Sequence, residues 1–120
     1  MRRTRLERSF ILDLQAQVSW LRQHRDAEYV ERLRDGIFNA RRLLAAKPGV
    51  GSPQLADGSI TIRKLLLRDL PFVIWYFHDE LAPRADVWLF RLFHARQDRP
   101  SPVVRRRQSR RRRRRVPPGL

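Results

Sequence analysis

The first half of the chain repeats its apolar positions every three or four residues, the spacing that lines one face of an α-helix. The first run has Ser9 before it as a plausible N-cap and contains Phe10, Ile11, Leu14, Val18 and Leu21. The second run follows Asp26, whose carboxylate can cap a helix, and contains Val30, Leu33, Ile37, Ala40 and Leu44. This run ends near Ala46, before the Pro and Gly residues of 47–51. The two runs predict an antiparallel helical hairpin.

Beyond Gly51 the apolar period changes to 2, and β-branched and aromatic residues become frequent. The strand candidates are Ile60 to Leu67, Phe72 to His78 and Asp86 to Phe93. Their connections are short, which favours an antiparallel meander. The middle run, FVIWYF, is apolar on both faces, so we expect it at the centre of the sheet, with the hairpin on one side. The pattern leaves a short N-terminal edge strand at 2–6 open.

These elements predict one α+β domain, with an N-terminal two-helix hairpin packed on a small antiparallel β-sheet. The order is helices first and sheet second, in two layers. A chain of 120 residues is long enough for one core. We place the domain at residues 1–100 and expect residues 101–120 to form a disordered, arginine-rich tail.

Two arginines interrupt otherwise apolar strands. Alternation along the last strand predicts one face with Val87, Leu89 and Phe93, and another with Trp88, Phe90 and Leu92. Arg91 breaks this pattern, and Arg63 does the same in the first strand. Each must reach solvent, pair with an acid or line a groove. Asp86 and Asp98 are the candidate acids.

Positive charge is concentrated at the end of the chain. The net charge is +15, and the nine arginines of 105–120 leave +6 on the rest. These arginines are Arg105, Arg106, Arg107, Arg110, Arg111, Arg112, Arg113, Arg114 and Arg115. Such a block repels itself and binds polyanions without sequence preference. We interpret it as a solvated accessory, with nonspecific nucleic-acid binding as the alternative.

Composition excludes several classes of site. The chain has no cysteine, and its histidines, His24, His78 and His94, lack metal-site spacing, so we expect neither a metal nor another cofactor. The opening residues lack the continuous apolar run of a signal peptide, and no stretch could span a bilayer. We expect a soluble, cytoplasmic protein without a membrane partner. Trp20, Trp75 and Trp88 could stack on nucleic-acid bases, but Trp75 and Trp88 lie in dense apolar runs and should be core.

Five segments in order carry a family resemblance. They are FILDLQAQVSWL with its Asp13-Leu14 pair, KPGVGSP, ITIRKLLL with Arg63, LPFVIWYF and VWLFRLFHARQD. Over roughly residues 5–99 the chain resembles the ParE/RelE superfamily of toxins from type II toxin–antitoxin systems, closest to the ParE or plasmid-stabilisation branch. The resemblance implies a hairpin against an antiparallel sheet. It also implies a cognate antitoxin whose C-terminal segment wraps the hairpin and lies along the sheet.

The resemblance leaves two activities open. A RelE-like toxin is a ribosome-dependent endoribonuclease that cuts mRNA; here it would use His94 as acid or base, with Arg63, Arg91 and Arg96 on phosphate. Family ribonucleases usually add a tyrosine or another acid–base residue near the last strand, whereas Ala95 follows His94 in this chain.

A ParE-like toxin inhibits DNA gyrase by binding it and needs no catalytic group. We favour this non-enzymatic function. The surface for the target or the antitoxin is then expected at Arg63, Arg91, His94, Arg96 and Asp98. A third alternative is an inactive relative that binds polyanions through its tail. For His94 itself, a structural hydrogen bond to backbone is the competing interpretation.

Overall fold

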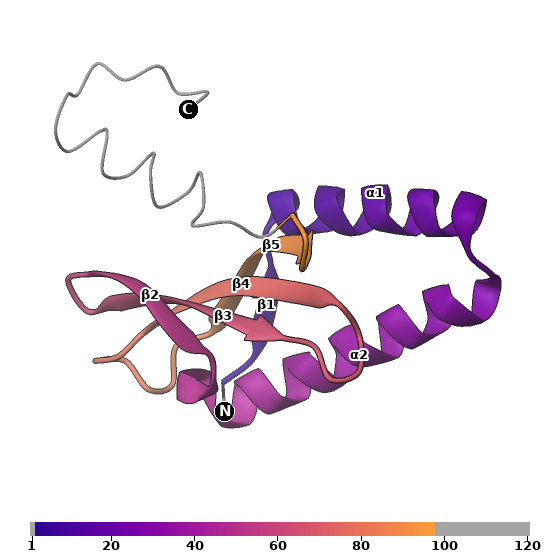
Figure 1. The fold of residues 1–120 in the computed structure, drawn as a ribbon. Coiled ribbons are helices and arrows are strands. Elements are labelled where there is room, and N and C mark those ends of the chain that lie inside the picture. Colours follow the sequence, from indigo (N-terminus) through magenta and orange to yellow (C-terminus); the bar gives the residue numbers. More distant parts are fainter. Residues whose placement is uncertain (1, 98–120) are drawn as a thin grey trace, which may run out of the picture.

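Two helices lie against one face of a five-stranded sheet in the computed structural model, which describes residues 2–97 (Figure 1). The elements are β1 (Thr4–Leu6), α1 (Arg8–His24), α2 (Ala27–Ala46), the 3-10 turn η1 (Pro48–Val50), β2 (Ser52–Asp57), β3 (Ile60–Leu66), β4 (Phe72–Asp79) and β5 (Val87–His94). The strand order is β1-β5-β4-β3-β2. β1 runs parallel to β5, and the other neighbours are antiparallel.

The α+β class, the hairpin and the three main strands are confirmed. Two strands change the picture. β1 precedes the helices and pairs in parallel with β5, so the sheet is mixed and the order of helices before sheet does not hold. β2 was not among the predicted strands, and its sequence, SPQLAD, has little apolar content; it is an edge strand, where Pro53 is tolerated. The predicted tail, 101–120, lies outside the described residues.

The sheet has apolar side chains on both faces, and β4 is buried on both, as its sequence predicts. The face toward the helices carries Phe72, Ile74, Tyr76, Val87, Leu89 and Leu92, packed with the apolar stripes of α1 and α2. The other face carries Ile62, Val73, Trp75 and Phe90, with Leu55, Phe77 and Phe93 packed against them.

A β-bulge in β5 corrects the predicted alternation of that strand. Arg91 pairs with Trp75, and Leu89 pairs with the next residue, Tyr76, so Phe90 is an inserted residue. One inserted residue exchanges the faces of everything after it. Leu92 therefore lies with Leu89 on the helix side. Phe93, which was predicted on that side, lies on the opposite face.

The N-terminal turn of α1 differs from the prediction, whereas that of α2 agrees with it. Asp26 caps α2 by accepting a 2.9 Å hydrogen bond from the Tyr29 backbone N–H. The N-cap of α1 is Glu7, and its side chain makes no capping bond. Ser9 lies inside the helix, where its hydroxyl donates to the carbonyl oxygen of Phe90 at 2.5 Å.

α1 replaces a strand along the part of the β5 edge that β1 does not reach, and Figure 1 shows it beside β5. The Glu7 N–H donates to the Leu89 carbonyl at 2.9 Å. Ser9 then donates to the bulged carbonyl, and four residues later Asp13 Oδ2 accepts the Leu92 N–H at 2.9 Å. Residues four apart lie on one helix face, so a single polar stripe satisfies the strand edge.

The N-terminal segment is also bound to the hairpin. Arg41 on α2 donates through Nε to the Thr4 hydroxyl at 2.7 Å and through Nη2 to the Thr4 carbonyl at 3.1 Å. Arg2 donates through Nε to the Ala45 carbonyl at 2.8 Å, at the C-terminal end of α2 where a positive charge is favourable. β1 is therefore held by both layers.

We expect Asp13→Ala to lower the free energy of unfolding by about 2 to 3 kcal/mol, because it leaves a guanidinium and a backbone N–H without their acceptor. Urea denaturation followed by far-UV circular dichroism measures the change. The control is Glu31→Ala, which removes the exposed pair with Arg34 and should cost about 0.5 kcal/mol or less. Equal losses in both variants would show that Asp13 does not hold α1 on the sheet.

Candidate functional site

Arg63 and His94 face the helix side of the sheet at different places along it. Arg63 pairs in register with Tyr76, and His94 pairs with Phe72. Those two partners are four positions apart on β4, a span of roughly 13 Å. The two side chains that a RelE-like ribonuclease would use together are not gathered at one point.

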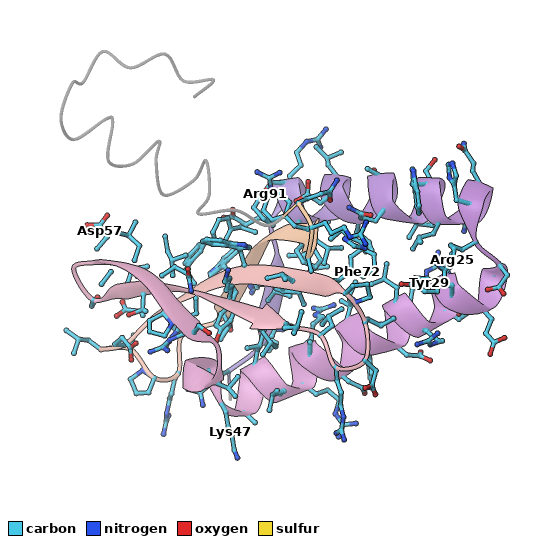
Figure 2. The ribbon with its side chains drawn as sticks, in the orientation of Figure 1. Arg25, Tyr29, Lys47, Asp57, Phe72 and Arg91 are labelled. Carbon is cyan, nitrogen blue, oxygen red and sulfur yellow. The ribbon has the colours of Figure 1, made fainter. Side chains whose placement is uncertain are left out.

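Arg91 lies on the opposite face and is engaged by α1. Its Nε donates to Asp13 Oδ2 at 2.7 Å and its Nη2 to Asp13 Oδ1 at 3.3 Å. The guanidinium carbon lies 4.6 Å from the centre of the Phe93 ring. Both side chains of the ion pair are largely buried, with 29% and 19% exposed. Arg91 therefore has a structural role, and Figure 2 shows it near the start of α1.

The acids suggested by the sequence are not the ones used. Asp86 accepts from Arg5 Nε at 2.7 Å, and this bond holds the pKa of Asp86 below its ordinary value. The predicted pairing of Asp86 with Arg63 or Arg91 is therefore wrong. Asp98 lies outside the described residues. No local signal pointed to the acids that are used, because each lies on a different element from its arginine.

Arg63 is the centre of a second polar network. Its Nη2 donates to Glu80 Oε2 at 3.2 Å, and its Nη1 donates to the Gly51 carbonyl at 2.8 Å. Its Nε donates to His78 Nε2 at 3.1 Å. Because His78 Nε2 accepts this bond, the neutral ring carries its proton on Nδ1.

Burial shapes the acid–base properties of this network. His78 is 6% exposed, and burial lowers its pKa despite the opposing charge of Glu80. Burial likewise raises the pKa of Tyr76. The Tyr76 hydroxyl donates to the Pro48 carbonyl at 2.6 Å and accepts from the Gly51 N–H at 2.8 Å. These two bonds of Tyr76 tie the η1 turn and the residue before β2 to the sheet.

His94 and Arg96 are the predicted site residues that the structure brings together. The Arg96 backbone N–H donates to His94 Nδ1 at 3.2 Å. The imidazole meets the buried Phe72 ring edge-on, with centroids 5.3 Å apart. His94 thus makes the structural bond to backbone that the sequence analysis considered, and its ring also lines a groove.

This groove lies between the hairpin and the end of the sheet and has a volume of about 530 Å³. It is lined by Ala16, Gln17, Trp20, Leu21, Arg25, Tyr29, Phe72, His94, Arg96 and Gln97. Figure 2 shows Arg25, Tyr29 and Phe72 between the corner of the hairpin and the start of β4. Sequence reasoning singled out His94 and Arg96 as site residues and named Trp20 only as a possible stacking residue; the four-residue spacing of Arg25 and Tyr29 was the available signal for the rest of the hairpin side.

The tryptophans divide between core and surface. Trp75 is fully buried, as predicted. Trp88 is partly buried and stacks on Phe77 with ring centroids 6.4 Å apart. Trp20 is 52% exposed. The exposed tryptophan at the groove therefore comes from α1.

Within residues 2–97, no cluster of three or more potential metal ligands is present. No helix in that range combines the length and apolar content needed to cross a membrane. Comparison with known proteins gives no assignment: no protein-family model matches the chain, and no curated protein matches it.

We expect Gly51→Ala to destabilise the protein by about 1 to 3 kcal/mol, because the network closes around this glycine. An added Cβ would lie 2.7 Å from the Lys64 carbonyl oxygen and 2.6 Å from the Tyr76 hydroxyl. The control is Gly49→Ala, whose Cβ would meet no atom within 4 Å. Thermal unfolding of both variants measures the difference, and a Gly51→Ala protein as stable as Gly49→Ala would contradict this packing.

The lowered pKa of His78 predicts a loss of stability in mild acid. In the unfolded chain His78 takes up a proton near its ordinary pKa of 6.5, whereas in the folded protein it does so only at a lower pH. Unfolding is therefore progressively favoured as the pH falls. Between about pH 7 and about pH 5, the unfolding free energy of His78→Gln should fall less than that of the wild type. Urea titrations across this range test the point. Above about pH 7 the two curves should run parallel, and parallel curves throughout would refute the prediction.

Proposed function

We propose that this chain is a ParE-like toxin of a type II toxin–antitoxin system, which inhibits DNA gyrase by binding it and is neutralised by a cognate antitoxin. The observation that carries the proposal is the separation of Arg63, Arg91 and His94 in the fold. The hairpin packed on a sheet with three antiparallel central strands also agrees with the architecture that the resemblance implies.

Cleavage of RNA requires a base, an acid and phosphate-binding cations around one reacting position. Arg63 and His94 are roughly 13 Å apart along the sheet. Arg91 lies across the sheet and is paired with Asp13. Such an arrangement is poor for catalysis, but it is compatible with a toxin that acts by binding.

A leucine-rich groove supports the antitoxin part of the proposal. It lies between α2 and the β3–β4 connection, has a volume of about 570 Å³, and includes Leu43, Leu65, Leu66, Leu67 and Leu70 in its lining. Leu66 is 62% exposed. The groove fits the apolar side of an antitoxin segment that crosses the hairpin and the sheet. An acidic antitoxin would be attracted to the net positive chain, which speeds encounter and favours selectivity.

The second candidate function is a RelE-like, ribosome-dependent mRNA endonuclease. One observation favours it: His94 and Arg96 line the same groove. An imidazole can transfer protons near neutral pH, and an arginine can hold a phosphate.

The test uses the full chain produced without an antitoxin. Gyrase supercoiling and cell-free translation are measured in parallel for the wild type and His94→Ala. We expect both proteins to inhibit supercoiling, with at most a few-fold difference, and neither to cleave mRNA. Because nonspecific DNA binding by the arginine block would also inhibit supercoiling, topoisomerase I relaxation of the same plasmid is the control, and it should be unaffected.

Two outcomes would overturn the proposal. Ribosome-dependent mRNA cleavage that is lost in His94→Ala would establish the endonuclease instead. Equal inhibition of gyrase and topoisomerase I, relieved by raising the salt concentration, would show that the chain only coats DNA, as the inactive relative would.

A further inference from the structure

Trp20 presents an unusually exposed aromatic surface at the groove between the hairpin and the end of the sheet. Its side chain is 52% exposed. His24, one turn later, stacks on it with ring centroids 4.2 Å apart and planes 13° apart. His24 Nδ1 also lies 2.9 Å from the Trp20 carbonyl oxygen, which fixes the imidazole in place. The indole is therefore held in one orientation while much of its surface stays accessible.

Two arginines bring positive charge to the same groove from different elements. Arg25 lies in the turn between α1 and α2, and its guanidinium carbon is 4.4 Å from the centre of the Tyr29 ring. Arg96 follows β5. An arginine stacked on a ring keeps its N–H groups free to bind an anion. Neither arginine forms an ion pair with a carboxylate of residues 2–97, in contrast to Arg63 and Arg91.

Of the described residues that line the groove, none is acidic. Three carboxylates adjoin lining residues in sequence: Asp26, which already caps α2, Glu28, and Asp98, which lies outside the described residues. The polar groups of the lining include two amides: Gln17 Nε2 donates to Gln97 Oε1 at 3.2 Å and so joins α1 to the segment after β5. Buried Phe72 provides an apolar surface. The groove thus combines aromatic, amide and cationic groups, and its volume is within the range of small-ligand sites.

We propose that this groove binds a nucleotide, with the base stacked on Trp20 and the phosphate held by Arg25 and Arg96. An aromatic base matches the flat indole, and a phosphate matches the two guanidinium groups. The amides of Gln17 and Gln97 lie in the same groove, where they can hydrogen-bond to the polar edge of a base. The site is for binding only and is independent of the proposed action on gyrase.

The nucleotide could be free or could be the end of a nucleic-acid strand, and the probes separate these sources. Isothermal titration calorimetry of the full chain is run with AMP, adenosine, pyrophosphate and the 5′-phosphorylated dinucleotide pApA. AMP should bind at least about tenfold more tightly than adenosine, which lacks the phosphate. If AMP binds, a free nucleotide is a sufficient ligand. If pApA binds in a Trp20-dependent manner and AMP does not, the ligand is the end of a nucleic-acid strand.

Three variants assign the binding to the groove. Trp20→Ala should weaken AMP binding about tenfold or more, because it removes base stacking, and Trp20→Phe should restore most of it. Arg25→Ala should weaken AMP binding about tenfold and adenosine binding little. The matched control is Arg84→Ala, an exposed arginine in the β4–β5 connection, which should leave AMP binding unchanged. Far-UV circular dichroism checks that each variant folds.

The arginine block at 105–115 is a competing site for any phosphate, but it is identical in all these proteins. Binding of AMP that is equal in wild type, Trp20→Ala and Arg25→Ala would place the ligand on that block and overturn the proposal. Absence of detectable binding of both AMP and pApA at millimolar concentration would overturn it as well. Gyrase takes no part in these measurements, so their failure would leave the toxin proposal standing.

Discussion

The edge of β5 must have hydrogen-bond partners, and the position of α1 follows from this requirement. β1 is only three residues long and pairs with β5 as far as Leu89. Beyond that point an exposed strand edge would be open to pairing with other chains. Ser9 and Asp13 provide the donor and acceptor that close it, and Gln17 continues the same stripe to Gln97. This alignment carries the C-terminal half of α1 past the end of β5, and the groove forms there.

The two strand arginines show how a cation is accommodated inside a small apolar fold. Arg91 has one carboxylate that also accepts a backbone N–H, while Arg63 distributes its donors over Glu80, His78 and a backbone carbonyl. In each case the hydrogen bonds and the opposite charge offset the free-energy cost of taking the guanidinium out of water. Removal of one partner would leave the other as an uncompensated charge. The two arginines therefore interrupt apolar strands because they hold α1 and the start of β2 on the sheet. Arg25 and Arg96 at the groove form no ion pair with any carboxylate in the described part of the chain.

The features that could be predicted from the sequence are those with a repeated local pattern. The apolar spacing of α2 and the doubly apolar β4 are sufficient to identify each element, and Asp26 marks the start of α2. The bulge at Phe90 has no such pattern, because one inserted residue looks the same in the sequence as an uninterrupted strand. Asp13 and Arg91 are 78 residues apart, so only the fold reveals that they pair. The groove was half found for the same reason: its two sides come from opposite ends of the domain.

The parallel pairing of β1 with β5 also dictates the order in which the chain can fold. Thr4 lies opposite Val87, so the first strand to be synthesised must wait for the last before it can enter the sheet. The hairpin and the β3–β4 pair depend on short-range contacts and can form early, whereas closing this long loop is entropically costly and slow. During synthesis the polar stripe of α1 has no strand to bind. We therefore expect the native sheet to be completed late, when β5 joins the N-terminal segment, the hairpin and the central strands.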